Sequence, residues 1–301
     1  MVPSRNLFTQ AKPETLSGKI FQFPLVRIFF VSLFIGPYLI FHNRIIADFI
    51  VSTSERMQAV LNVLDAVFSI VMMILLYSLY IRVVEKRQAH EMSLKKSFHE
   101  MSSGFLISFG LVGFMVLIMT VLGYYRVGQL NSPFAILEGL FFFGIGSFIQ
   151  VLAFRLILFR LMEELMGTWI AFVLVASVFG IAHIFNPNAG IGSTLALVLG
   201  DVLLAAAFVY TRRLWLVWGI HLGWNFFQDG IFGMPNSGIT ELVSWIQPEI
   251  RGPGWITGGN FGIELSYIAL VFSFAVGVII FKRAIDKKQI VRPVWRRQEG
   301  D

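Results

Sequence analysis

The sequence contains no cysteine and little charge, and each absence excludes a class of protein. Without cysteine in its 301 residues, the chain has no disulfide framework, no thiolate metal site and no cysteine nucleophile. Charged residues make up only 14% of the chain, against 56% hydrophobic residues and a mean hydropathy of +0.74. Soluble domains carry about 25% charged residues, so this composition predicts a protein that lies within a membrane.

The excess of positive charge does not indicate nucleic-acid binding. The net charge is +6, but the Lys and Arg residues lie beside apolar segments instead of along one polar face. Basic residues in that position are the usual signal of membrane topology. We therefore expect membrane lipids as partners and no nucleic acid.

Apolar segments long enough to cross a bilayer recur along the chain. A hydrocarbon core of about 30 Å needs roughly 20 apolar helical residues. About eight segments meet this requirement, at residues 24–41, 58–82, 103–125, 134–161, 168–185, 191–211, 213–232 and 262–282. The sequence therefore predicts an all-α, polytopic membrane protein with about eight transmembrane helices.

One membrane domain is expected, with basic residues that predict its orientation. The expected parts are a cytoplasmic segment at 1–23, the first helices at 24–130, the core at 131–238, an outer loop with the last helix at 239–282, and a basic cytoplasmic tail at 283–301. If the helices alternate, most Lys and Arg of the short loops fall on the side of the two termini, which is then cytoplasmic.

Two connections between the helices carry specific expectations. The connector at residues 84–100 is basic and amphipathic, which suits either a helix on the anionic inner leaflet or an ordinary solvated connector. The stretch from Phe232 to Gly262 is rich in glycine and proline and is the longest outer connection, so it could lie over whatever opens on that face.

Polar residues inside apolar segments are candidates for a functional site, because they usually face the interior of a helix bundle. In GIHLGWNFF, His221 and Asn225 are four residues apart and share one helix face, and in FGIAHIFNP, His183 ends an apolar run. Two imidazoles and a carboxamide can polarise water and donate hydrogen bonds to an oxyanion. The alternative is structural: each histidine could satisfy a backbone carbonyl at a helix break.

Residues 134–238 resemble the CPBP family, also called Abi, which includes the CAAX prenyl proteases. The resemblance is carried by FGIAH and HLGWN, by MGTW at 166–169, by AHIFNPNA at 182–189 and by RRLWLVWGIHLGWNFFQDGIFGMPNSG at 212–238. It implies a membrane-embedded peptidase fold of metallo- or glutamate type, with a membrane peptide or protein as substrate or partner. Because bacterial members read most alike, it also implies a bacterial plasma membrane.

The first motif of that family, EExxxR, is altered in this chain. In the family a glutamate pair activates water and an arginine follows. The matching stretch here is QVLAFR, in which Gln150 and Val151 replace the pair and Arg155 is the motif arginine. A helical hairpin that turns near Gly167 supports this match, because it would place Gln150 and His183 at one depth in the membrane.

The adjacent acids Glu163 and Glu164 are not interpreted as the family's pair. Thr168 stands where the motif requires arginine, and the two acids lie roughly 20 Å along the helix from Gln150. Their expected role is the solvated acidic end of a long helix, near Arg160.

The altered motif leaves three hypotheses. A carboxamide cannot take a proton from water, so a catalytically impaired peptidase homologue is the first. The second is an active peptidase that uses His183, His221, Asn225 and another base such as Asp201, although Asp201 could instead pair with Arg155 or a histidine. The third is a transporter or channel. No cofactor is certain, and a divalent metal such as zinc on His183 and His221 stays open, although catalytic zinc usually has three protein ligands.

Overall fold

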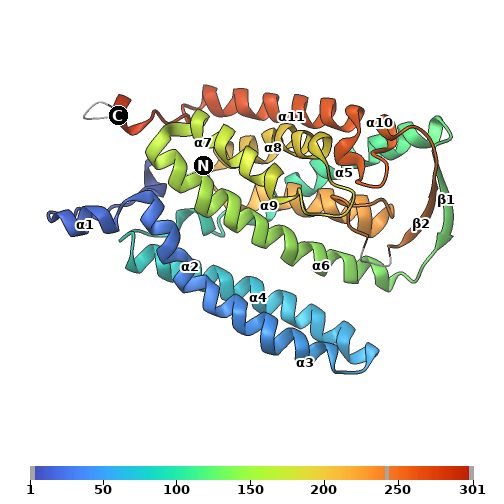
Figure 1. The fold of residues 1–301 in the computed structure, drawn as a ribbon, viewed down its shortest axis with the longest axis horizontal. Helices are drawn as coiled ribbons and strands as arrows, with labels where there is room; N and C mark the ends of the chain where they lie inside the picture. The colour runs from blue at the N-terminus through green and yellow to red at the C-terminus, as the bar shows by residue number, and fades with distance from the viewer. Residues whose placement is uncertain (1–3, 241–243, 298–301) are drawn as a thin grey trace.

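The computed structural model describes residues 4–240 and 244–297, and these residues are mainly helical (Figure 1). The α-helices are α1 Leu16–Phe21, α2 Pro24–Phe41, α3 Ala47–Val51, α4 Glu55–Val83, α5 Ser97–Val121, α6 Phe134–Val151, α7 Arg160–Ala182, α8 Ile191–Thr211, α9 Leu214–Asn225, α10 Gly254–Thr257 and α11 Tyr267–Asp286. Three π-helical segments, His42–Ile46, Leu152–Phe159 and Phe226–Ile231, continue α2, α6 and α9. The predicted all-α membrane fold is confirmed.

A small antiparallel sheet was not predicted. Strand β1, Tyr125–Leu130, pairs with β2, Ile246–Ile250, and Tyr125 is aligned with Ile250. The two strands lie at one end of the molecule, whereas both chain ends lie at the other (Figure 1). The sheet joins two connections that are far apart in sequence. Residues 1–3, 241–243 and 298–301, which belong to three of the predicted segments, lie outside the described residues.

Six helices in the described residues are long and apolar enough to cross a membrane. They are Pro24–Val51, Val60–Val83, Ser97–Val121, Phe134–Ala182, Ile191–Thr211 and Tyr267–Asp286. The fourth holds two of the predicted segments, because the chain stays helical on both sides of a turn. The predicted segment 213–232 is helical as well, but His221, Asn225, Gln228 and Asp229 make it more polar. The count of eight stays a prediction.

The turn inside the fourth candidate span is at Gly167, as the sequence predicts. Its φ of 76° and ψ of 169° break the helix within α7. The rings of Phe154 and Phe179, which lie about equally far before and after Gly167, are 5.1 Å apart. A Cβ atom on Gly167 would lie 2.6 Å from the Pro293 nitrogen, so only glycine fits this turn. The hairpin is therefore confirmed, and both Gln150 and His183 line one cavity.

Small residues let α5 and α9 pack closely, and this contact positions the helix that carries His221. A Cβ atom on Gly219 would lie 2.3 Å from the Met101 carbonyl oxygen, and one on Gly104 would lie 2.4 Å from the Leu216 carbonyl oxygen. Membrane helices approach each other through such small residues because lipid supplies no hydrophobic force between them. In addition, Ser108 Oγ donates a hydrogen bond to the Ile220 carbonyl at 2.6 Å.

Buried ion pairs tie together the end of the molecule that holds both termini. The Glu85 carboxylate, just after α4, lies 2.8 Å from Arg160, 2.9 Å from Arg87 and 3.2 Å from Arg27. Burial alone raises the pKa of Glu85, but the Arg160, Arg87 and Arg27 guanidinium groups outweigh burial and lower the pKa to about 2. The N-terminal segment joins this cluster, since the backbone N–H of Gln10 donates to the Glu85 carbonyl.

The connector at residues 84–100 does not have the expected form. Only a 3₁₀ turn, His90–Met92, forms before α5 begins. Glu91 is fully buried and lies 2.7 Å from Arg87, which in turn contacts Glu85. An amphipathic helix on a leaflet is therefore wrong, because three of the charged side chains of the connector turn inward to pair with one another.

The interpretation of Glu163 and Glu164 as a solvated helix end is also wrong. Glu163 is fully buried in an ion pair with Arg212, and it accepts a hydrogen bond from the Thr168 hydroxyl. Glu164 lies 2.5 Å from Arg27 of α2. Both partners come from distant parts of the chain. These acids link helices at the end of the molecule that holds both termini.

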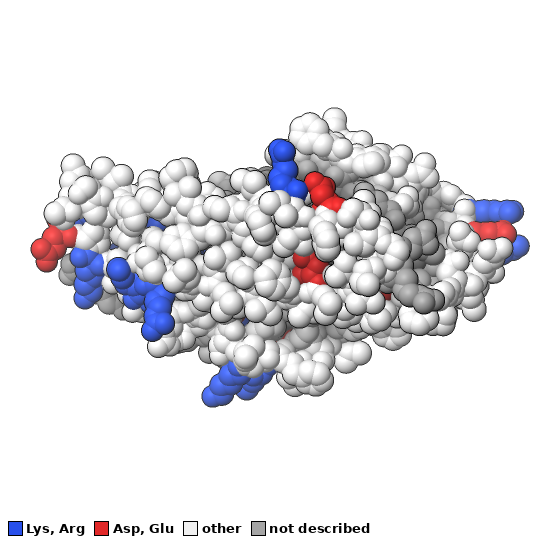
Figure 2. All heavy atoms as spheres, turned by 90° about the horizontal axis from the view of Figure 1, so that it is seen from below, with Lys and Arg blue, Asp and Glu red and all other residues white. Residues whose placement is uncertain are grey.

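The surface is largely uncharged over its middle. Figure 2 shows one face in which white, uncharged residues cover most of the surface, with several Lys and Arg toward the end of the molecule that holds the termini and a few charged residues near the middle and at the opposite end. A surface with so few charged residues suits a protein embedded in a bilayer, where charges are costly. The chain is an integral membrane protein, and the assignment of the cytoplasmic side stays a prediction.

Candidate active site

The main cavity of the described residues lies between α6, α7, α8 and α9 and has a volume of about 1040 Å³. Gln150, His183, Asp201, His221 and Asn225 all line it. The cavity continues along α6 to the hairpin of α2 and α4, where His42 and Asp65 line it as well. The structure thus brings together the polar residues that the sequence placed on four separate segments.

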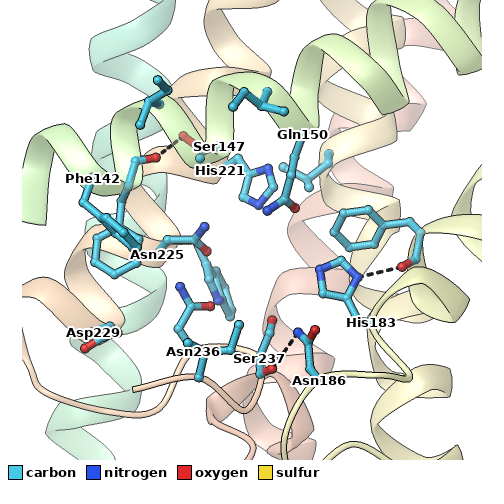
Figure 3. A pocket seen from close by; sticks show the side chains of 18 of the residues that line it. Phe142, Ser147, Gln150, His183, Asn186, His221, Asn225, Asp229, Asn236 and Ser237 are labelled. Atoms are coloured by element: carbon cyan, nitrogen blue, oxygen red, sulfur yellow. Dashed lines mark hydrogen bonds between the residues drawn. The ribbon is translucent and has the colours of Figure 1, made fainter. Parts of the chain in front are cut away.

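His183 lies at the C-terminal end of α7. Its Nδ1 is 2.7 Å from the Phe179 carbonyl oxygen (Figure 3). Since a carbonyl only accepts, Nδ1 carries the proton and Nε2 of the neutral ring is left as an acceptor. The Phe179 ring lies near both imidazoles, with its centroid 4.6 Å from that of His183 and 6.2 Å from that of His221. The backbone bond that the structural alternative expected is present, and it leaves one ring nitrogen available.

His221 and Asn225 lie one turn apart on α9 and point into the cavity (Figure 3). The exposed fractions of their side chains are 8% and 9%, and neither has a hydrogen-bond partner in the described part of the chain. The π-helical segment Phe226–Ile231 begins directly after Asn225. Such π segments often occur at functional sites, where the wider turn alters which residues face inward.

Gln150 occupies the last turn of α6 and also points into the cavity (Figure 3). Its Oε1 is buried and has no hydrogen-bond partner among the residues that the structure describes. Val151, the next residue, is 1% exposed and belongs to the apolar core. Of the two residues that replace the glutamate pair, Gln150 therefore faces the cavity, whereas Val151 packs away from it.

Asp201 of α8 forms an ion pair with Arg155, which lies in the π-helical segment Leu152–Phe159. The side chains are 0% and 1% exposed. Asp201 lines the cavity, but Arg155 does not. The guanidinium therefore holds the carboxylate from behind the cavity wall, which is the structural role that the sequence offered as one alternative.

Comparison with known families identifies the segment that holds this cavity. Residues 130–227 match the model of the type II CAAX prenyl endopeptidase Rce1-like family. The match covers about a third of the chain, so residues 130–227 are similar to that family. The match contains Gln150, Arg155, His183, Asp201 and His221. No curated protein and no solved structure matches the chain.

The donor set of this site does not fit a catalytic zinc ion. Among the described residues, no group of three or more His, Asp or Glu side chains could hold a metal. His183 and His221 supply two nitrogens, Gln150 and Asn225 are amides, and Asp201 is held by Arg155. Because catalytic zinc usually needs three protein ligands, no step is assigned to a metal here.

The connection between α9 and α11 adds cavity residues that the sequence did not single out. Asn236, Ser237 and Glu264 line the cavity. The Asn186 side chain donates to the Ser237 carbonyl at 2.9 Å, and the Ser237 backbone N–H donates to Glu264 at 3.1 Å. Asn186 and Asn236 belong to AHIFNPNA and GMPNSG, but no polar periodicity marks them as cavity residues. Residues of the stretch from Phe232 to Gly262 line the cavity, and its place over an opening stays a prediction.

Glu264 lines the same part of the cavity and lies just before α11, which is long and apolar enough to cross a membrane. Burial raises the pKa of Glu264 to about 7, although hydrogen bonds from Gln228 and Ser237 act in the opposite direction. The Gln228 side-chain N–H donates to the carboxylate at 2.8 Å. The part of the cavity lined by Asn236, Ser237 and Glu264 therefore contains a carboxyl group that holds its proton near neutral pH.

Proposed function

We propose that this protein is a peptide-binding, Rce1-like membrane protein whose hydrolytic activity is strongly impaired. The observation that carries the proposal is the amide of Gln150 in the cavity that also contains His183 and His221. A carboxylate can take a proton from water and return it to the leaving amine. A carboxamide has no accessible pKa for either task and can only form hydrogen bonds.

The positions of the other carboxylates in the core support the proposal. Asp201 is paired with Arg155, while Glu163 and Glu164 are paired with arginines at the end of the molecule that holds both termini. A carboxylate that is engaged by a guanidinium group is less available to accept a proton from water. None of these three acids therefore replaces the missing glutamate in this proposal.

The remaining groups suit the binding of a peptide. Nε2 of His183 can accept a hydrogen bond from a peptide N–H, and the Asn225 amide can donate one to a peptide carbonyl. Phe142, Phe143 and Phe179 supply apolar surface in the same cavity. The proposed ligand is a membrane peptide or protein segment, held in a bacterial plasma membrane protein with both termini cytoplasmic.

The second candidate function is an active peptidase in which Asp201 supplies the base. The observation that favours it is that Asp201 lines the cavity together with both histidines. In that reaction, Asp201 would accept the proton of the attacking water, and the imidazoles would polarise the water and the peptide carbonyl. It requires Arg155 to release or share the carboxylate.

The proposal is tested by restoring one carboxylate. We expect Gln150→Glu to raise the cleavage rate of a detergent-soluble peptide panel by about 10² to 10⁴ over wild type, the usual contribution of a general base. Val151 is left unchanged, because a glutamate at that position would enter the apolar core. The matched control is Gln150→Met, which has similar size but cannot titrate and should show only the wild-type rate. Wild-type cleavage within tenfold of the Gln150→Glu rate contradicts the proposal.

A further inference from the structure

The cavity is lined by five acidic residues beside the three histidines His42, His183 and His221. The acidic side chains are those of Asp65, Glu138, Asp201, Asp229 and Glu264, of which Glu264 holds its proton near neutral pH. Among the residues described by the structure, no Lys or Arg lines the cavity. Arg155 neutralises Asp201 from behind the wall, and the His42 Nε2 lies 2.8 Å from the Asp65 carboxylate. Glu138, on the first turns of α6, is exposed and has no hydrogen bond or ion pair in the described residues.

Two further residues show independently that the cavity is built to hold a ligand. His221 and Asn225 are more than nine-tenths buried, point into the cavity and lack a hydrogen-bond partner in the described chain (Figure 3). Buried polar groups in proteins are normally hydrogen-bonded, because an unpaired one is costly. Polar atoms of a bound ligand would satisfy these two side chains. The acidic residues of the lining then determine which charge the ligand can carry.

The wall near the hairpin of α2 and α4 is polar along one helix face. Gln58, Asn62, Asp65 and Ser69 are three or four residues apart on α4 and all line the cavity. Tyr38 of α2 contacts Ser69 through their hydroxyl oxygens at 2.5 Å. All these groups are neutral or acidic, so this wall offers acceptors to a ligand and no fixed positive charge.

We propose that the ligand of this cavity is an apolar chain that carries a cationic nitrogen, an ammonium or a guanidinium group. The proposal rests on the proposed peptide-binding function and names the charge of the peptide. Among the described residues, the carboxylates of Asp65 and Glu138 have no Lys or Arg as a partner, so they attract a cation and repel an anion. The rings of Phe142, Phe179 and Trp224 line the same space, and aromatic faces also attract cations.

The first experiment compares matched peptides on the full-length protein in detergent. Three fluorescent peptides share one apolar sequence and end in an amidated Lys, Gln or Glu residue, and their binding is measured by anisotropy. We expect the Lys peptide to bind at least tenfold more tightly than the Gln peptide, and the Glu peptide to bind more weakly than the Gln peptide. Equal binding of the three within threefold, or tightest binding of the Glu peptide, overturns the proposal.

Variants assign the charge preference to the cavity. Glu138→Gln, at an exposed position where folding should be preserved, should reduce the ratio of Lys to Gln affinity at least threefold, and Asp65→Asn should reduce it as well. The matched control is Glu249→Gln on β2, which removes an exposed carboxylate that lies outside the cavity. A preference that survives Glu138→Gln and Asp65→Asn in folded protein overturns the proposal.

A second set of ligands distinguishes recognition of the positive charge from recognition of a peptide. Decylamine and decanol differ in charge but contain no peptide bond. Selective binding of decylamine without binding of the Lys peptide would keep the cation site and reject the peptide. If neither decylamine nor the Lys peptide binds, the cation proposal fails. Mass spectrometry of the same samples reads cleavage separately, so that an active peptidase contradicts the proposed impairment without affecting the charge preference.

Discussion

The pair of Arg155 and Asp201 provides a direct test of what the intramembrane aspartate does. Both side chains are at most 1% exposed, and Arg155 has no other ion-pair partner in the described residues. The change Asp201→Asn would leave a buried guanidinium without its counter-charge. Breaking a buried pair by removing one partner costs about 3–5 kcal/mol.

That magnitude corresponds to a change in the unfolding equilibrium between about a hundredfold and a few thousandfold. The assay is unfolding of the purified protein in mixed micelles, followed by tryptophan fluorescence. The double variant Arg155→Met with Asp201→Leu should recover most of the lost stability, because apolar residues of similar size often replace a buried ion pair without a net cost. If Asp201→Asn unfolds like wild type and the double variant is no more stable, Asp201 is not a structural partner of Arg155 and this reasoning is refuted.

Two further predictions concern packing and pH. Gly219→Ala should lower the unfolding temperature clearly, because its Cβ would lie 2.3 Å from the Met101 carbonyl oxygen. Gly110→Ala should not lower it, because no atom lies within 4 Å of its Cβ. Equal effects of the two changes would contradict the close packing of α5 and α9. Glu264 should make stability depend on pH, because its raised pKa means that the unfolded chain releases the proton near pH 4.5 and the folded chain only near 7. Stability should therefore fall by up to about 3 kcal/mol as pH rises from 4.5 to 7 and then level off, and Glu264→Gln should remove this step in thermal unfolding; an unchanged step would assign it to another group.

The parts of the fold that could be predicted from sequence are those that follow from local composition. Apolar length predicts the helices, and the hairpin at Gly167 follows from two apolar segments joined by a glycine. The equal distances of Gln150 and His183 from that turn then bring both to one cavity. His221 and Asn225 follow in the same way from the spacing of one helix turn. The positions of these residues could be predicted because they depend only on segments that are neighbours in the sequence.

The interpretations that failed depend on partners far away in the sequence. Glu164 was expected in solvent, but Arg27 of α2 reaches it, and Arg212 reaches Glu163. No local sequence pattern predicts such ion pairs, because each side chain taken alone resembles an ordinary charged residue at a helix end. The pairing of β1 with β2 was missed for the same reason, because two short strands that are far apart carry a weak signal.

The central claim is that the amide of Gln150 leaves the cavity without a base, and wild-type cleavage tests it most directly. The measurement is the rate of peptide cleavage by purified wild type, His183→Ala, Asp201→Asn and Gln150→Ala on one detergent-soluble panel. We expect wild type to cleave little or nothing and the three variants not to differ from it. Robust wild-type cleavage that His183→Ala and Asp201→Asn each abolish in folded protein, while Gln150→Ala leaves it intact, would contradict the proposed impairment and identify Asp201 as the base.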